Sequence, residues 1–345
     1  MRIIAFPKSG ISYNDCFYQA IENQGVEVLE GVFSGGWLAG NIVSGDWIHI
    51  HWPSFFYSGK YGRIQQVIWF LRFLALLALI RSKGGRVIWT AHNLFPHDRA
   101  VVPQLDFIGR HVIIKISKII LIHGHEAAQL FVSSFPSSRK KITIIPHGHW
   151  INYYPMDLSK DAAREQLNIP KLSFVYLFIG LCKPYKNVDI LIKSFRDQED
   201  NNSLLIIAGK FQDLNYRNEI SSLASADPRI IIHEGYIPNE KMQVYLKACD
   251  TVVVPYREIL TSGTAMLAMS FGRPLISVSM GFLRDVVNQN IGILFSPDDP
   301  QGLTHALNAC RYASFEEHAI LDHARQFTFE DAANLCVTAM KQTNA

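Results

Sequence analysis

The chain has few cysteines and few charged residues for its length of 345 residues. Its five cysteines are widely spaced and none belongs to a CxxC pair. An odd and scattered set argues against a disulfide framework and suits a reducing cytosol. Charged residues make up only 18% and the net charge is +3. This composition speaks against a disordered protein, and nothing in it indicates a nucleic-acid partner.

The sequence also lacks a secretory leader and the common zinc signatures. The N-terminal stretch MRIIAFPKSG is typical of a short strand and a turn. It has neither the apolar run nor the cleavage site of a signal peptide. There is no HExxH helix and no Cys/His finger spacing. We therefore expect a cytoplasmic protein that uses no metal and no other cofactor.

What is abundant is apolar sequence arranged in short alternating segments. Hydrophobic residues make up 48%, which is enough for the two cores that the length suggests. Short apolar runs such as 86–90, 203–209 and 251–254 predict strands, and segments such as 103–118 predict helices. Their alternation predicts βαβ units and parallel sheets. The polar, proline-containing stretch 152–170 is the best candidate for a linker. The sequence thus predicts an α/β protein with two doubly wound, Rossmann-like domains facing across a cleft. The expected domains are residues 1–152 and 153–326, with a helix over 327–345 that crosses back to the first.

The segment 64–80, IQQVIWFLRFLALLALI, is unusually apolar. It is at the lower length limit for spanning a bilayer, and Arg72 at its centre makes spanning unfavourable. Two interpretations stay open. The segment is either a buried domain helix, or an apolar helix in the membrane interface with basic flanks on anionic headgroups.

The stretch 251–274, TVVVPYREILTSGTAMLAMSFGRP, has the order of a buried strand, a polar loop and a helix. Ligands of open α/β sheets bind at the carboxyl ends of strands. The backbone amides of Ser262, Gly263 and Thr264 would there face an anion at the start of the helix. Glu258 is the one carboxylate of the loop and suits neutral hydroxyls such as those of a ribose. The alternative is an ordinary turn with Ser262 as the helix cap.

Lys183 and Lys186 lie between another strand and the helix that follows it. Two ammonium groups beside a helix start suit a diphosphate, and the alternative is a solvated basic turn. In the first half, histidines recur at the ends of predicted strands, namely His49 and His51, His92 and His97, His123 and His125, and His147 and His149. Such histidines could bind sugar hydroxyls or phosphate, hold a metal, act as a base, or simply bond the nearby backbone.

Several blocks, in order, resemble the GT-B glycosyltransferases that use nucleotide sugars for bacterial exopolysaccharide. Residues 180–195, GLCKPYKNVDILIKSF, are similar to that family's donor-diphosphate loop. Residues 233–256 are similar to the block that passes the nucleotide base, and 262–276 to the helix that holds the donor phosphate. The block 144–150, IIPHGHW, resembles the strand end near the transferred sugar.

The resemblance implies a role for each candidate residue. The donor nucleotide sugar would be held by Gly180, Lys183, Lys186, Tyr236, Glu258, Ser262, Gly263 and Thr264. Sugar and acceptor would meet His51, Trp52, His147 and Gly148. The acceptor would be a polyprenyl-diphosphate-linked glycan, and 64–80 would dock on the cytoplasmic face of the inner membrane.

The sequence departs from the retaining members of that clan. Leu267 stands where they carry a second Glu, and Glu258 lies nine residues before it instead of eight. The pattern is more similar to inverting β-mannosyltransferases that use GDP-mannose, which need a base. His92, His97 and Asp98 are the candidates for that base. Two alternatives stay open, a retaining enzyme of the same fold that uses a UDP-sugar, and a non-catalytic sugar- or nucleotide-binding partner of a polysaccharide assembly.

Overall fold

The chain folds into two compact units, which we describe from a computed structural model covering residues 1–58, 62–97, 100–198, 200 and 202–344. Unit 1 comprises Met1–Gly148 and Thr328–Ala345, and unit 2 comprises His149–Phe327. Unit 1 ends after Gly148 and not after residue 152 as predicted. The reason is local, because the amide of His149 donates a hydrogen bond of 2.8 Å to the carbonyl of Phe327 and so belongs to unit 2.

Unit 1 is built on a six-stranded sheet in the order β2-β1-β3-β4-β5-β6, with every pair parallel. The central strands are apolar and buried on both faces, as parallel strands covered by helices are. The strand order reverses between β1 and β3, which is the switch point of a doubly wound sheet. The strands are β1 (Arg2–Phe6), β2 (Glu27–Glu30), β3 (Trp47–Ile50), β4 (Arg86–Thr90), β5 (Ser117–His123) and β6 (Ile142–Ile145).

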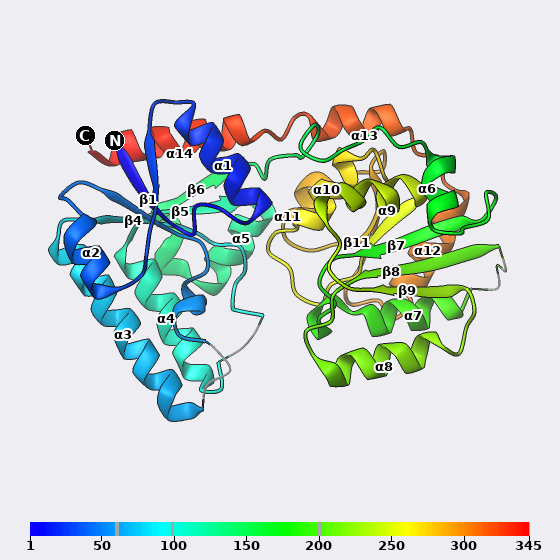
Figure 1. The fold of residues 1–345 in the computed structure, drawn as a ribbon, viewed down its shortest axis with the longest axis horizontal. Coiled ribbons are helices and arrows are strands. Elements are labelled where there is room, and N and C mark those ends of the chain that lie inside the picture. The colour runs from blue at the N-terminus through cyan, green and yellow to red at the C-terminus, as the bar shows by residue number, and fades with distance from the viewer. Residues whose placement is uncertain (59–61, 98–99, 199, 201, 345) are drawn as a thin grey trace. The chain divides into compact units, whose positions relative to one another are not determined.

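Helices cover both faces of this sheet, with α3 and α4 on one side and α1 and α14 on the other (Figure 1). The last helix packs against α1, β5 and β6, so the C-terminus completes the core of unit 1. The helical segments are α1 (Ser12–Glu22), α2 (Gly35–Asn41), α3 (Arg63–Ser82), α4 (Pro103–Ile116), α5 (His125–Ser134) and α14 (Phe329–Asn344), with the 3₁₀ turns η1 (Pro53–Phe56) and η2 (Pro136–Lys141).

Unit 2 repeats the architecture with a different strand order, β12-β11-β10-β7-β8-β9, again all parallel. Numbered from the first strand of the unit, this is the order 3-2-1-4-5-6 of the dinucleotide-binding fold. The direction of winding reverses between β7 and β10. The strands are β7 (Phe174–Ile179), β8 (Ser203–Gly209), β9 (Ile230–Glu234), β10 (Thr251–Val254), β11 (Leu275–Val278) and β12 (Gly292–Phe295).

The helices of unit 2 also lie on both faces of its sheet. One layer contains α7, α8 and α12, and the other contains α6, α9, α10 and α13 (Figure 1). The helical segments are α6 (Lys160–Gln166), α7 (Val188–Arg196), α8 (Leu214–Ala224), α9 (Met242–Ala248), α10 (Gly263–Ser270), α11 (Phe282–Val286), α12 (Gly302–Tyr312) and α13 (Glu317–Ala324), with the 3₁₀ turns η3 (Pro184–Lys186) and η4 (Asn239–Lys241).

The stretch 152–170, predicted as a linker, is an ordered part of unit 2. Ser159 caps α6 by accepting a bond from the amide of Ala162. Arg164 on that helix is buried, pairs with Asp250 at 2.7 Å and donates to the carbonyl of Ala248. A long-range ion pair of this kind is invisible in local sequence pattern, which explains the wrong prediction.

The long helix α3 matches neither of its two interpretations completely. By length and composition, the helix is long and apolar enough to cross a membrane. Only 33% of its most apolar 18-residue segment is buried in the structure. One face packs into unit 1 through Phe70, Phe73 and Leu77. A second face stays exposed and is apolar, with Ile64, Val67, Ile68 and Leu71 at helical spacing.

Candidate functional site

Three of the predicted donor-binding residues, Gly180, Lys186 and Thr264, converge at the switch point of unit 2. Gly180 directly follows β7 and has a φ of +125°, a backbone conformation that favours glycine. A Cβ atom built on Gly180 would lie 3.3 Å from Nζ of Lys186 and 3.9 Å from Oγ1 of Thr264. The loop after β7 and the start of α10 after β10 therefore enclose one small space, at the place where open α/β sheets bind ligands.

Lys186 is the charged group of this space. It is only 8% exposed, and its Nζ lies 4.9 Å from the centre of the Tyr256 ring. Burial by itself lowers the pKa of Lys186, but Tyr256 and Tyr185 outweigh that effect and raise it, so the ammonium group is charged at neutral pH. Within the described part of the chain, no carboxylate pairs with this ammonium. Tyr256 contributes its ring and hydroxyl but no carboxylate, so this ammonium group is suited to an anionic ligand.

The N-terminus of α10 forms the opposite wall. Ser262 is the helix cap, and its hydroxyl accepts a bond of 3.2 Å from the amide of Ala265. The amides of Gly263 and Thr264 precede the first intrahelical bond, as in every helix. The hydroxyl of Tyr256 donates to Oγ1 of Thr264 at 3.2 Å. The cap and the anion site are thus compatible, since the cap uses the Ser262 side chain and the site uses backbone.

Two loops are tied together next to this space. The side chain of Asn187, which adopts a left-handed conformation, donates to the carbonyl of Pro255 at 2.9 Å. The amide of Arg257 donates to the carbonyl of Tyr185 at 2.8 Å, and its guanidinium bonds Asn187 and pairs with Asp189. The loops after β7 and β10 are therefore joined by backbone and side chain.

Three further candidates lie at the edge of this region. Lys183 directly precedes η3 and is partly exposed, and Glu258 is exposed in the loop before α10. Tyr236 is 74% exposed and lines a separate pocket of about 330 Å³ with His233 and Lys241, just beyond the end of β9. Their roles toward a diphosphate, a ribose and a base stay predictions.

In unit 1, histidines from adjacent strand ends form a continuous hydrogen-bonded chain. His92 Nε2 lies 3.0 Å from His51 Nδ1, and His51 Nε2 lies 2.7 Å from the hydroxyl of Tyr18. That hydroxyl lies 2.9 Å from His49 Nδ1, and His49 Nε2 lies 2.8 Å from Oγ1 of Thr90. If every hydrogen bond in this chain is donated in the direction of Thr90, His92 donates through Nε2–H. Its Nδ1 then carries no proton and can accept one. This is the arrangement that a general base requires.

Other candidates surround this chain. The Trp52 ring stacks on His92 with centroids 4.6 Å apart, so this predicted sugar- and acceptor-binding residue lies against the candidate base. His147 is buried, and its ring lies 5.0 Å from that of His123. Gly148 has a packing reason to be glycine, because a Cβ there would lie 2.3 Å from the Phe329 ring.

The remaining base candidates are less informative. His97 lies partly buried in the loop after β4, and Asp98 lies outside the described residues. Over the described ranges, no group of three or more His, Cys, Asp or Glu side chains is arranged to hold a metal ion. Three of the recurring histidines, His49, His51 and His92, thus form a hydrogen-bonded chain, and the metal interpretation has no geometric support among the described residues.

Comparison with known proteins identifies the second unit. The family model described as Glycosyl transferases group 1 matches residues 159–311. Unit 2 carries a glycosyl transferases group 1 domain. The matched range contains the whole space around Lys186, from the loop after β7 to the end of α10. The predicted resemblance is confirmed for this group 1 domain.

One curated relative is a GDP-mannose:glycolipid 4-beta-D-mannosyltransferase of Xanthomonas campestris pv. campestris. It is 28% identical over 242 residues, which cover 67% of this chain and 61% of the relative. The chain therefore spans less than two thirds of that relative's length.

Solved structures resemble the whole chain, including the group 1 domain. A glycosyltransferase from Rickettsia africae has a TM-score of 0.70 at 11% identity, covering 99% of this chain and 97% of its own. The Anabaena protein Alr3699/HepE, in complex with UDP and glucose, has a TM-score of 0.66 at 15% identity, covering 100% and 97%. The predicted GT-B fold class, with two parallel doubly wound sheets and alternating helices, is confirmed.

Sequence reasoning missed two aromatic side chains that organise these sites. Tyr256 in the group 1 domain contacts both Lys186 and Thr264, and Tyr18 in unit 1 joins two histidines. Tyr256 directly follows Pro255 at the end of a buried strand, and that position was a usable signal. Tyr18 lies inside a helix, where no local pattern distinguishes it from an ordinary core residue.

Burial also makes the histidines sensitive to acid. It lowers the pKa of His49 to about 3 and that of His147 to about 4. Burial, assisted by neighbouring histidines, lowers the pKa of His51, His92 and His123 well below 6.5. The rings of His49 and His147 are therefore neutral in the folded protein at pH 5, where the same rings in the unfolded chain are protonated.

We expect the free energy of unfolding to fall as the pH drops below 6.5. The pKa values of these histidines are lower in the folded protein than in the unfolded chain. Their contribution to the free energy of unfolding is therefore complete above pH 6.5 and is lost as the pH falls toward 4 and 3. Each such histidine contributes about 2 kcal/mol of loss between pH 7 and pH 5. Urea midpoints measured from pH 7 to pH 5 test this, and His49→Gln should reduce the slope. The exposed His305, changed to Gln, is the control, and an equal slope in wild type and His49→Gln would contradict the expectation.

Proposed function

We propose that the chain is a glycosyltransferase that moves a sugar from a nucleoside-diphosphate sugar to a lipid-linked oligosaccharide. The first choice of donor is GDP-mannose, as in the name of the Xanthomonas relative. The observation that carries the proposal is the buried ammonium group of Lys186 beside the start of α10, which has no carboxylate partner in the part of the chain that the structure describes. A diphosphate supplies the charge that this space lacks.

The proposed reaction is an inverting displacement. The acceptor hydroxyl attacks the anomeric carbon, its proton passes to Nδ1 of His92, and the bond to the diphosphate oxygen breaks. Lys186, Lys183 and the amides of α10 stabilise the charge that develops on the leaving diphosphate, so the proposal requires no metal. Trp52 supplies an apolar surface beside the base, and His51, His147 and Gly148 line the same edge of the sheet. The pathway we propose is exopolysaccharide synthesis.

A retaining enzyme that uses a UDP-sugar is the second candidate. It is favoured by the likeness to the Anabaena structure, which holds UDP and glucose. The configuration of the anomeric carbon in the product, read by NMR, separates the two candidates. An inverted product supports the first, and a retained one supports the second.

Nucleotide binding tests the proposal without an acceptor. In a thermal-shift series with GDP, UDP, ADP and dTDP, we expect GDP to give the largest stabilisation. A hundredfold excess over the dissociation constant adds about 2.7 kcal/mol to the native state, or about 5–10 °C for a domain of this size. No stabilisation by any of the four would contradict the proposal. GDP binding without transfer from labelled GDP-mannose would instead favour a non-catalytic partner.

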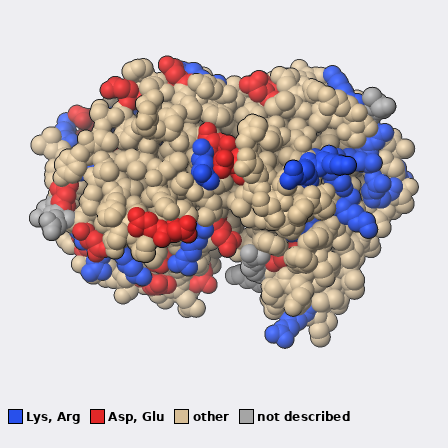
Figure 2. All heavy atoms as spheres, turned by 180° about the vertical axis from the view of Figure 1, so that it is seen from behind, with Lys and Arg blue, Asp and Glu red and all other residues tan. Residues whose placement is uncertain are grey.

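We further propose that the protein is cytoplasmic and associates with the inner membrane face through α3. The apolar exposed face formed by Ile64, Val67, Ile68 and Leu71 is unlike a solvated helix face. At the other end of α3, Arg81 lines one hollow together with Lys115, Lys118 and Lys141. Figure 2 shows Lys and Arg side chains gathered into one patch on the face that it presents. An exposed apolar face together with a cluster of cations at the other end of the same helix favours a membrane with anionic headgroups.

The double change Ile68→Asp and Leu71→Asp should weaken binding to phosphatidylglycerol vesicles by roughly 100-fold, because two apolar side chains leave the bilayer. Vesicle sedimentation measures the partition. Leu172→Asp is the control, since Leu172 is 88% exposed but lies in unit 2. If the double variant sediments like the wild type, α3 is not the membrane contact.

A further inference from the structure

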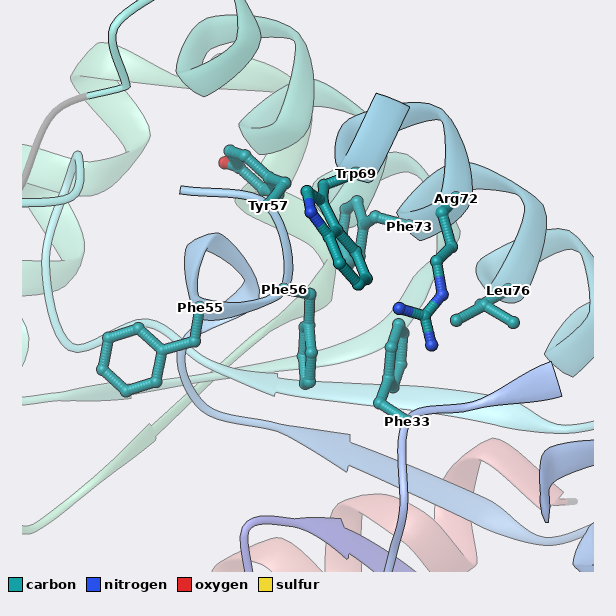
Figure 3. Close-up of a pocket in the computed structure, with 8 residues that line it drawn as sticks. All are labelled: Phe33, Phe55, Phe56, Tyr57, Trp69, Arg72, Phe73 and Leu76. Atoms are coloured by element: carbon teal, nitrogen blue, oxygen red, sulfur yellow. The ribbon is translucent and has the colours of Figure 1, made fainter. Parts of the chain in front are cut away.

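A second pocket lies between α3 and η1, away from the histidine chain. It has a volume of about 180 Å³, and seven of its eight lining residues are aromatic or leucine. Figure 3 shows Phe33 and Phe56 lying face to face below Trp69 and Phe73. The Phe33 and Phe56 rings stack with centroids 3.9 Å apart. A cavity of about 150 Å³ lined by apolar side chains holds benzene, so this pocket has room for a branched five-carbon group.

The eighth lining residue is a cation, Arg72 (Figure 3). Its guanidinium stacks on the Trp69 ring at 4.5 Å and extends beside Phe33 and Leu76. Within the described ranges, Arg72 has no carboxylate partner. An arginine held against aromatic rings keeps its charge and presents several N–H donors in a fixed plane, which suits a phosphate.

Two surfaces adjoin residues that line the pocket, and together they indicate its ligand. On one side, the exposed apolar face of α3 begins at Leu71, next to Arg72 in the chain. On the other side, Phe55 of η1 stacks on Trp52 at 5.6 Å, and Trp52 stacks on His92. Unit 1 thus presents, one after another, the exposed apolar face of α3, the cation Arg72, and the aromatic rings that lead to the candidate base.

We propose that this pocket binds the phosphate-bearing end of the acceptor's lipid, with its first isoprenoid-like units among the aromatic rings and a phosphate on Arg72. The rest of the lipid follows the exposed face of α3, and the glycan extends past Phe55 toward Trp52. The identity of this ligand as an acceptor rests on the proposed function. The site itself rests on the pocket, the unpaired guanidinium and the adjoining surfaces.

Calorimetric titration of the full chain with geranyl diphosphate, geraniol and inorganic pyrophosphate, each alone and without donor, tests this site. We expect geranyl diphosphate to bind at least about tenfold more tightly than either part of it. Arg72→Gln should cost about tenfold for geranyl diphosphate and little for geraniol, because only the phosphate contact is lost. Leu76→Trp fills the pocket and should weaken both. Arg63→Gln, the same charge change elsewhere on α3, should bind like the wild type.

Three results would overturn the proposal. The first is an affinity for geranyl diphosphate that is the same in Arg72→Gln as in the wild type. Because Arg72 is exposed, we expect this variant to fold, and its melting temperature checks this. The second is equal affinity for pyrophosphate and geranyl diphosphate. The third is binding that is kept in Arg72→Gln but lost in Lys186→Met, which would place the ligand in unit 2. Because no donor is present, intact binding without sugar transfer would overturn the proposed function and leave this site standing.

Discussion

Lys186→Met is expected to lower the rate of sugar transfer by at least about 100-fold, the effect of removing a preorganised donor from a developing anion. The native ammonium group is 8% exposed and lies beside the start of α10. Methionine keeps the apolar stem and removes the charge. Initial rates with labelled GDP-mannose measure the loss. Lys193→Met is the control, because it removes the same charge from an exposed position on α7 of the same unit.

The same substitution should have little effect on the ligand-free protein. Tyr256 and Tyr185 outweigh the desolvation of the ammonium group, and methionine keeps the apolar stem, so the melting temperature without nucleotide should change little. The stabilisation by GDP should shrink at the same time. A rate within twofold of the wild type, or a lower melting temperature with unchanged GDP stabilisation, would show that Lys186 is a structural residue.

His92→Ala is expected to lower kcat by about 100- to 10,000-fold, the range for loss of a general base. Burial, with contributions from His147, His49 and Arg110, lowers the pKa of His92 well below 6.5. The neutral, proton-accepting form therefore persists below pH 6.5. We expect the wild-type rate to stay constant from pH 8 to below pH 6.5 and then to fall as the ring is protonated.

Tyr18→Phe separates the base from its support. It removes the hydroxyl that joins His51 to His49, without touching His92. We expect a smaller loss of kcat, about tenfold, and a shift of the acid limb of the pH–rate profile. Without the Tyr18 hydroxyl, His49 no longer fixes the tautomers of His51 and His92. His305→Gln changes an exposed histidine and serves as the control. A full rate in His92→Ala, or an acid limb that survives in it, would assign the base elsewhere.

The strands were the most predictable part of this fold. The runs at 86–90, 203–209 and 251–254 are strands with the predicted bounds, because buried parallel strands are continuous apolar runs. The ends of helices were predicted less accurately. Residues 117 and 118 were assigned to a helix, but they begin β5, where Ser117 pairs with Val87 of β4. Pairing between distant strands decided those residues, and local propensity carries no information about it.

The candidate site was predictable only where it followed strand ends. Lys186 and Thr264 were found from their position after a strand, and the structure brings them around Gly180. Short helices such as α2 and α13 were not predicted. The link between histidines through Tyr18 joins residues far apart in the chain. No spacing rule within one element reveals such a contact.

The ties between the loops after β7 and β10 have a consequence for the energetics of association. Asn187, Pro255 and Arg257 hold these loops in one arrangement in the ligand-free chain. A nucleotide that enters there orders little backbone, so most of its interaction energy is retained as affinity. The heat-capacity change of nucleotide binding should accordingly equal the value expected from the surface that the nucleotide itself covers. A loop that folded on its ligand would add a further negative heat-capacity change.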